Sequence, residues 1–123
     1  MNIQKLNEIV EDLKEDCGKG LLATDIYAAA DGQPIAGYNS NPKGAALANR
    51  QRTLVNQALR ESNFPELNRY FLLHLEGGLI IINMSLGDYQ WGMLFDENKI
   101  QLGLLLNVIV PKTTNALLEL LSA

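Results

Sequence analysis

Between residues 70 and 95, apolar and polar residues alternate in three short runs separated by glycine-containing turns. Alternation with a period of two is typical of strands, because successive side chains of a strand point to opposite faces of the sheet. Gly77-Gly78 and Gly87-Asp88 supply the residues that two-residue hairpin turns prefer. This stretch therefore predicts three consecutive antiparallel strands.

The middle run is apolar at every position from Leu79 to Ile82, which is typical of a strand covered on both faces. In the preceding run, Phe71, Leu73 and Leu75 share one face. We assign that face to the core, and we expect other elements to pack on both faces of the sheet.

The N-terminal part of the chain predicts a helix followed by another hairpin. Residues 2–17 carry apolar side chains at alternating spacings of three and four, as an amphipathic helix does, and Gly18 ends it. Two apolar runs, 21–30 and 34–38, then flank the turn signal Asp31-Gly32. These runs predict the first two strands.

A second helix is predicted in the middle of the chain. Asn41-Pro42 is a typical helix start, and Phe64-Pro65 ends the helix near Ser62. Its apolar residues spread over an arc of about 140°, wider than the roughly 100° stripe of a helix that lies on one sheet. We infer two contacts for this helix. Ala48, Val55 and Leu59 are assigned to the sheet, and Leu47, Leu54 and Ala58 to a surface outside this chain.

The apolar pattern of the last segment is compatible with either a strand or a helix. Its apolar residues alternate from Ile100 to Val110 as in a strand, while Leu105 and Ile109 fill in a helical face. Pro111 adds a difficulty, because a proline inside a helix costs about 3 kcal/mol and kinks or ends it. Periodicity alone leaves open whether a helix is straight, kinked or broken here.

Composition fits one compact domain over residues 1–123, since 47% of the residues are hydrophobic and 20% are charged. The net charge of −4 and the lack of a Lys/Arg cluster argue against nucleic acid or an anionic membrane as the main partner. No uninterrupted apolar run approaches the roughly 20 residues that span a bilayer. With one cysteine and no signal peptide before the first helix, we expect a cytoplasmic protein without membrane insertion.

Candidate catalytic residues are few and scattered. His74 and Glu76 lie two apart on one strand face, yet no second His or Cys pair completes a metal site. Cys17 lacks a base nearby, because the only histidine belongs to a distant strand. We therefore expect a structural histidine and a buried core cysteine.

Two other patterns do not indicate a catalytic or nucleotide-binding site, because of where they lie and how they are spaced. Asp25, Asp88 and Asp96 offer carboxylates, but two of the three lie at strand ends or turns, where Asp is common. Residues 37–44 are bounded by glycines and include Lys43, but they lack the Walker A spacing. We expect no enzyme activity, no metal and no cofactor, and the chain is not predicted to be a P-loop GTPase.

Four short motifs accompany the predicted order of helix, two strands, helix, three strands, helix. They are 20–23 (GLLA), 31–36 (DGQPIA), 70–73 (YFLL) with 75–78 (LEGG), and Leu102-Gly103. With these motifs the chain resembles, over essentially its whole length, the roadblock/LC7 family in its bacterial and archaeal GTPase-regulating form. Each motif is a turn with apolar positions, and none is a catalytic signature. Pro111 departs from the continuous last helix of the family.

The resemblance implies a profilin-like α+β sandwich, a five-stranded antiparallel sheet with the middle helix on one face and the terminal helices on the other. It also implies a homodimer in which the middle helices pair and the third strands join two sheets into one. Such proteins are scaffolds or regulators of small Ras-like GTPases, bound on the face of the paired helices. The alternative is a small-molecule-sensing module of the PAS or profilin-like type, which is less favoured because the inward positions are filled by Leu, Ile and Phe.

Two sets of functional residues follow. The dimer interface is assigned to Leu47, Leu54, Ala58, Tyr70, Leu72 and His74. The GTPase contact is assigned to polar residues that border the apolar arc, Arg50, Gln57 and Glu61. If the protein influences hydrolysis, we expect it to position the switch loops of the GTPase rather than to lend Arg50 or Arg52 as a finger.

Overall fold

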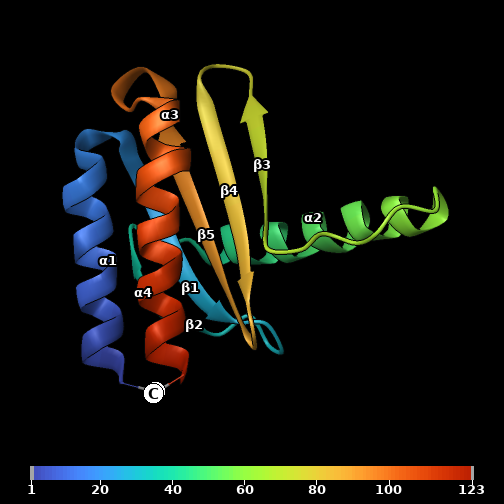
Figure 1. The fold of residues 1–123 in the computed structure, drawn as a ribbon, viewed down its shortest axis with the longest axis horizontal. Coiled ribbons are helices and arrows are strands. Elements are labelled where there is room, and N and C mark those ends of the chain that lie inside the picture. Colours follow the sequence, from blue (N-terminus) through green and yellow to red (C-terminus); the bar gives the residue numbers. More distant parts are fainter. Residues whose placement is uncertain (1, 123) are drawn as a thin grey trace.

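The computed structural model describes residues 2–122, without the side chain of Pro42, and shows a five-stranded sheet with helices on both faces (Figure 1). Its elements are α1 (Ile3–Cys17), β1 (Leu21–Ala28), β2 (Pro34–Tyr38), α2 (Pro42–Glu61), β3 (Tyr70–Leu75), β4 (Leu79–Leu86), β5 (Tyr89–Asp96), α3 (Leu102–Leu104), a π-helical turn (Leu105–Ile109) and α4 (Val110–Ser122). The predicted order of helices and strands is confirmed.

The sheet is antiparallel throughout and has the strand order β2-β1-β5-β4-β3. The turn between β3 and β4 is built as predicted, because Gly77 and Gly78 have φ angles of +86° and +83°, which the primed hairpin turns need and glycine adopts without strain. Since β3 is paired on one side only, it forms one edge of the sheet.

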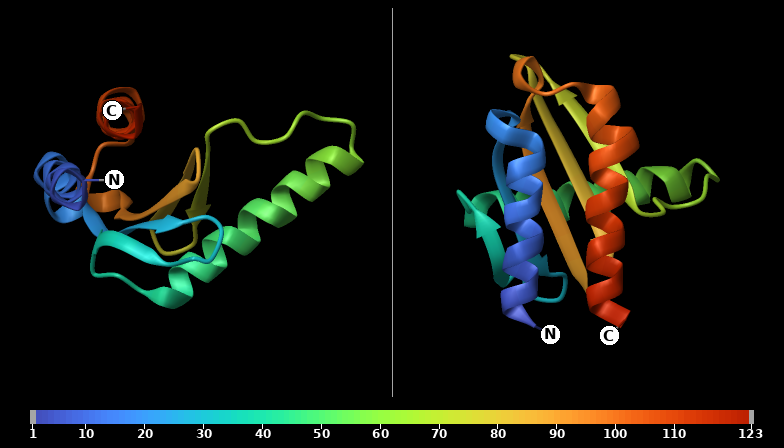
Figure 2. Two further views of the ribbon diagram at one scale, coloured as in Figure 1. Left: turned by 90° about the horizontal axis from the view of Figure 1, so that it is seen from below. Right: turned by 60° about the vertical axis from the view of Figure 1, so that its left-hand side comes forward.

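The helices form two unequal layers. Figure 2 shows α1 and α4 together on one face of the sheet and α2 on the other, as predicted. The main core lies between the sheet and the pair α1 and α4. Its largest fully buried side chains include Trp91, Phe95 and Ile82 from the sheet and Leu6 and Leu13 from α1.

The C-terminal segment is one helix, from Leu102 to Ser122, so the strand interpretation is wrong. Pro111 does not break it. Because proline has no N–H and its ring crowds the carbonyl four residues back, the helix widens just before it, and the Val110 N–H bonds to the carbonyl of Leu105, five residues back. Such a π-helical turn is a known way to insert an irregular residue into a helix.

By length and composition alone, this helix is apolar enough to cross a membrane, the one such helix among the described residues. One side of it, which includes Leu105, Ile109 and Leu117, is buried in the main core. Packing inside the domain therefore accounts for part of its apolar composition.

The middle helix, α2, covers only part of the opposite face. Ala45, Ala48 and Arg52 are buried, but none of residues 53–70 is. At 20 residues, α2 is about 30 Å long, and its C-terminal half projects past β3 (Figure 1).

This projection corrects two sequence-based assignments. Val55 and Leu59, assigned to the sheet, are half-buried and belong to neither core cluster, because that part of α2 lies beyond the sheet. The face of β3 assigned to the core is buried only at Phe71. Leu73 is half-buried and Leu75 is exposed, since α2 does not cover that end of the strand.

A buried polar network fixes α2 to the sheet. Arg52 donates from Nε to Asn83 Oδ1 at 3.0 Å and from Nη2 to the carbonyls of Asn83 (3.1 Å) and Arg69 (3.2 Å). Asn83 Nδ2 donates to the Tyr27 hydroxyl (3.2 Å), which donates to Gln90 Oε1 (2.8 Å). Burial lowers the pKa of Arg52 and is the largest cause of the raised pKa of Tyr27. The network thus joins α2 to three strands.

We predict that Arg52→Ala lowers the free energy of unfolding by about 2–4 kcal/mol, because it leaves buried acceptors on Asn83 and Arg69 without their charged donor. Urea denaturation measures the loss. Arg50→Ala is the matched control, since Arg50 is exposed on the same helix, and it should change stability by no more than about 0.5 kcal/mol. Equal losses in the two variants would show that the network does not hold α2.

Candidate functional site

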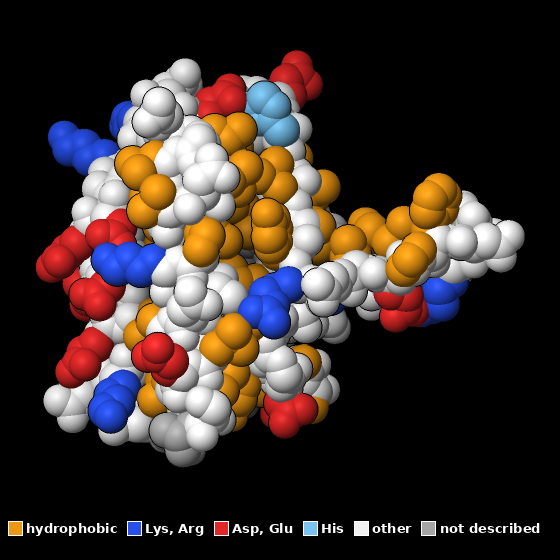
Figure 3. Space-filling model, in the orientation of Figure 1, with side chains coloured by type: hydrophobic (Ala, Val, Ile, Leu, Met, Phe, Trp, Pro, Cys, Tyr) orange, Lys and Arg blue, Asp and Glu red, His pale blue; other side chains and the backbone are white. Residues whose placement is uncertain are grey.

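The most prominent uncovered feature is an apolar surface along α2. Leu47 is 51% exposed and Leu54 is 54% exposed, and both share one side of the helix with exposed Ala58, at spacings of seven and four. Phe64, just beyond the helix, is 63% exposed. We call these four residues the α2 apolar surface. Figure 3, which views the molecule from the α1 and α4 side, shows further hydrophobic side chains on the projecting segment of the chain.

Contiguous exposed apolar residues typically mark an interaction site. The structure leaves Leu47, Leu54 and Ala58 exposed within one chain, as expected for residues that contact something outside it. What they contact stays a prediction.

The free edge of β3 lies beside this surface. A strand at a sheet edge presents unpaired N–H and C=O groups that can pair with another chain. Tyr70 and His74 are exposed on this strand, and half-buried Leu72 packs against the main core. His74 Nε2 lies 2.6 Å from Glu97 Oε2.

The six residues predicted for the dimer interface therefore fall on two faces. Leu47, Leu54 and Ala58 belong to the α2 side of the sheet. The strand residues Tyr70, Leu72 and His74 pair with Met84, Ile82 and Ile80, which face α1 and α4. The two groups meet only at the β3 edge.

Two exposed apolar residues on the α2 side were missed in the sequence. Leu75 was assigned to the core from its alternation, and Phe64 was used only as part of a helix stop signal. An aromatic residue next to a helix stop is a signal that would have pointed to Phe64.

A cavity of about 300 Å³ opens between α2 and the sheet. Small residues on both walls, among them Ala23, Gly44 and Gly92, account for it, because they leave the space that larger side chains would fill. Because Leu, Ile and Phe fill the inward positions, little space for a cavity was expected, and that expectation is wrong.

The rest of the cavity wall is largely apolar, and two of its several polar residues carry an oxygen without a partner. Leu47 comes from α2, and Ile81 and Leu94 from β4 and β5. Asp25 Oδ1 and Gln51 Oε1 are buried acceptors without a hydrogen-bond partner among the described residues. Other groups are therefore needed to satisfy both oxygens.

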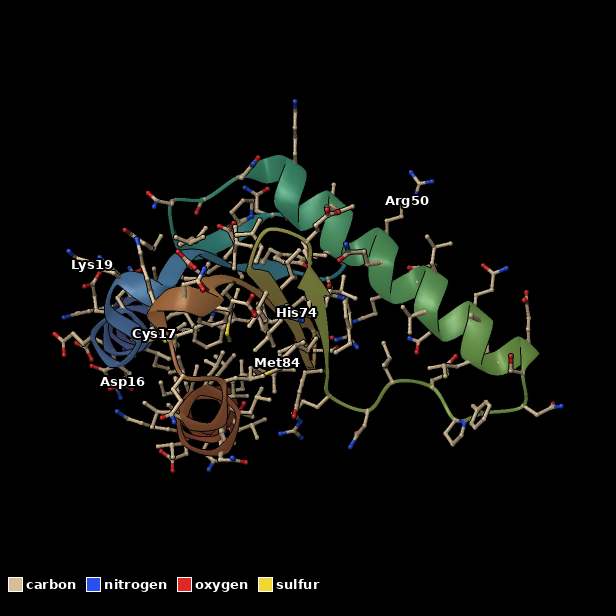
Figure 4. The ribbon with its side chains drawn as sticks, turned by 90° about the horizontal axis from the view of Figure 1, so that it is seen from above. Asp16, Cys17, Lys19, Arg50, His74 and Met84 are labelled. Carbon is tan, nitrogen blue, oxygen red and sulfur yellow. The ribbon has the colours of Figure 1, made fainter. Side chains whose placement is uncertain are left out.

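The residues predicted for GTPase contact lie on the outer side of α2. Arg50, Gln57 and Glu61 are all exposed, and Arg50 points away from the sheet (Figure 4). Gln57 Nε2 donates to Glu61 Oε1 at 3.1 Å. The three side chains thus border the α2 apolar surface on a face that is open to a partner.

The candidate catalytic groups remain apart in the fold. No group of three or more His, Cys, Asp or Glu within residues 2–122 is arranged to hold a metal ion. Cys17 is buried at the end of α1, and burial, together with neighbouring Asp16, raises the pKa of its thiol to about 11. The thiol is therefore protonated at neutral pH, which is unfavourable for a nucleophile.

No family model and no curated protein matches the chain, whereas several solved structures share its fold. MglB of Myxococcus xanthus superposes with a TM-score of 0.80 at 15% identity, over 98% of this chain and 90% of that one. The roadblock/LC7 domain from Streptomyces avermitilis superposes with a TM-score of 0.74 at 13% identity, over 95% of this chain and 98% of that one. Profilin II of Acanthamoeba castellanii superposes with a TM-score of 0.60 at 18% identity, over 93% of this chain and 97% of that one.

The chain therefore has the roadblock/LC7 fold, a profilin-like α+β sandwich, as predicted from the sequence. Within that fold it is similar to MglB.

Proposed function

We propose that this protein is a cytoplasmic, non-catalytic homodimer that binds a small Ras-like GTPase and modulates its nucleotide cycle or its localisation. The α2 apolar surface, on a helix that projects beyond its own sheet, is the observation that carries the proposal. The likeness in fold to MglB and to a roadblock/LC7 domain supports the GTPase as the partner, through the role that this resemblance implies.

A second copy satisfies the exposed groups on both elements at once. If two β3 edges pair about a two-fold axis, their unpaired backbone groups bond to each other and two sheets become one. The same rotation brings the projecting half of each α2 over the other copy, where Leu54 and Ala58 are covered. An isologous interface of this kind uses one surface twice.

The outer side of the paired helices then forms a single polar platform. Arg50, Gln57 and Glu61 occur on it twice, once from each copy, and offer both charges and an amide to a partner. In this proposal the GTPase rests on the platform, and its switch loops are positioned by contact rather than by a catalytic group of this chain.

The cavity beside α2 is the one observation that favours a small-molecule sensor. A ligand site needs apolar walls and a few convergent polar groups, and the cavity has both. Its wall includes Leu47, however, which also belongs to the α2 apolar surface. The cavity is thus continuous with the proposed dimer interface, which favours a protein occupant.

We predict that Leu54→Glu dissociates the dimer, because each new carboxylate would be buried against its own copy across the two-fold axis. Val108→Glu is the matched control. Val108 is also 54% exposed, but it lies on the C-terminal helix, which packs on the opposite face. Sedimentation equilibrium should give a dimer for wild type and control and a monomer for Leu54→Glu. A monomeric wild-type protein would contradict the proposed homodimer.

We predict that a small Ras-like GTPase from the same cell binds this protein at micromolar concentration and changes its rate of GTP hydrolysis, its rate of nucleotide release or its cellular position. Joint replacement of Arg50, Gln57 and Glu61 by Ala should weaken binding about tenfold or more, since a few interface residues carry most of the binding energy. Glu119→Ala, an exposed residue of α4, is the control. If none of the small GTPases of that cell binds, the function is not the one proposed.

A further inference from the structure

We propose that the cavity beside α2 receives Phe64 of a second copy, so that each copy of the dimer closes the cavity of the other. This inference rests on the proposed homodimer and adds to it a specific contact, in which an aromatic residue from one chain completes the interior of its partner.

The cavity has the size and lining for an aromatic ring. A cavity of roughly 150 Å³ lined by apolar residues holds benzene, and the space beside α2 measures about 300 Å³. Leu47, Ile81 and Leu94 lie in its wall. A phenyl group therefore fits and would contact aliphatic side chains.

Phe64 is exposed and rigidly placed at the end of α2. Asn63 has a φ of +62°, and its N–H bonds to the carbonyl of Arg60 at 3.1 Å, while the N–H of Phe64 bonds to the carbonyl of Leu59 at 2.9 Å. This pair of bonds is the Schellman motif that ends many helices. Because the backbone is already ordered, inserting the exposed ring costs little conformational entropy.

The length of α2 brings this end to the right place. Arg52 bonds to Asn83, so the helix crosses β4 at that point. From Arg52 to Glu61, the last residue of α2, there are nine residues, about 14 Å at 1.5 Å each. Across two paired β3 edges, the β4 of the second copy is three strand spacings away, about 14 Å, and its β5 four spacings, about 19 Å.

The end of α2 therefore arrives over β4 of the second copy, the strand that contributes Ile81 to the cavity. Phe64 follows three residues later, and the strand that carries Leu94 is one further spacing, about 5 Å, away. The reach of the helix end and the apolar lining of the cavity thus agree.

Disulfide cross-linking tests the contact directly in the full chain. Leu47→Cys and Phe64→Cys are combined in one chain, where fourteen helical residues, about 21 Å, separate Leu47 from the end of α2, too far for an internal bond. Mild oxidation should therefore give a covalent dimer. The two single variants, and Phe64→Cys combined with Val108→Cys, are controls that should give little or none.

A binding measurement accompanies the cross-link. Phe64→Ala should raise the Kd of the dimer about a hundredfold, because both copies lose a buried ring, while Val108→Ala should leave it unchanged. A wild-type dimer that neither cross-links through this pair nor weakens with Phe64→Ala would overturn the inference and leave the proposed function standing. A monomeric wild type would overturn both.

Discussion

The structure depends on one mismatch, a helix longer than the width of sheet available to it. The buried Arg52 ties α2 to Asn83 of β4, near the edge of the sheet, and the helix continues for nine more residues without burying any of them. Such a helix end loses the packing that normally stabilises helices in proteins. In the proposed homodimer a second copy restores that packing and also pairs the open β3 edge beside the same helix.

This constraint connects the fold with the proposed function. The face with α1 and α4 holds the main hydrophobic core, while the face with α2 is anchored chiefly by a polar network and small residues. A side that is incomplete in one chain is suited to assembly, because its residues gain burial only when a partner arrives.

Local signals in the sequence predicted most of the fold. Gly77-Gly78 predicted the hairpin, and the spacing of apolar residues predicted α1 and α2. Turns and amphipathic faces are determined by residues that are close together in the sequence. Relations between distant elements were not predictable in this way. How far α2 covers the sheet depends on a bond between Arg52 and Asn83, 31 residues apart. For that reason Val55 was misplaced and the cavity between α2 and the sheet was missed.

The central claim is that the side of the sheet with α2 and β3 is an interface between two copies of this chain. Amide hydrogen exchange along β3, from Tyr70 to Leu75, tests it most directly, because in an isolated chain alternate N–H groups of this edge strand have no partner. The account predicts that the outward-facing amides are protected at concentrations where the dimer forms and lose protection on dilution. Rapid exchange of these alternate amides at every concentration would contradict it.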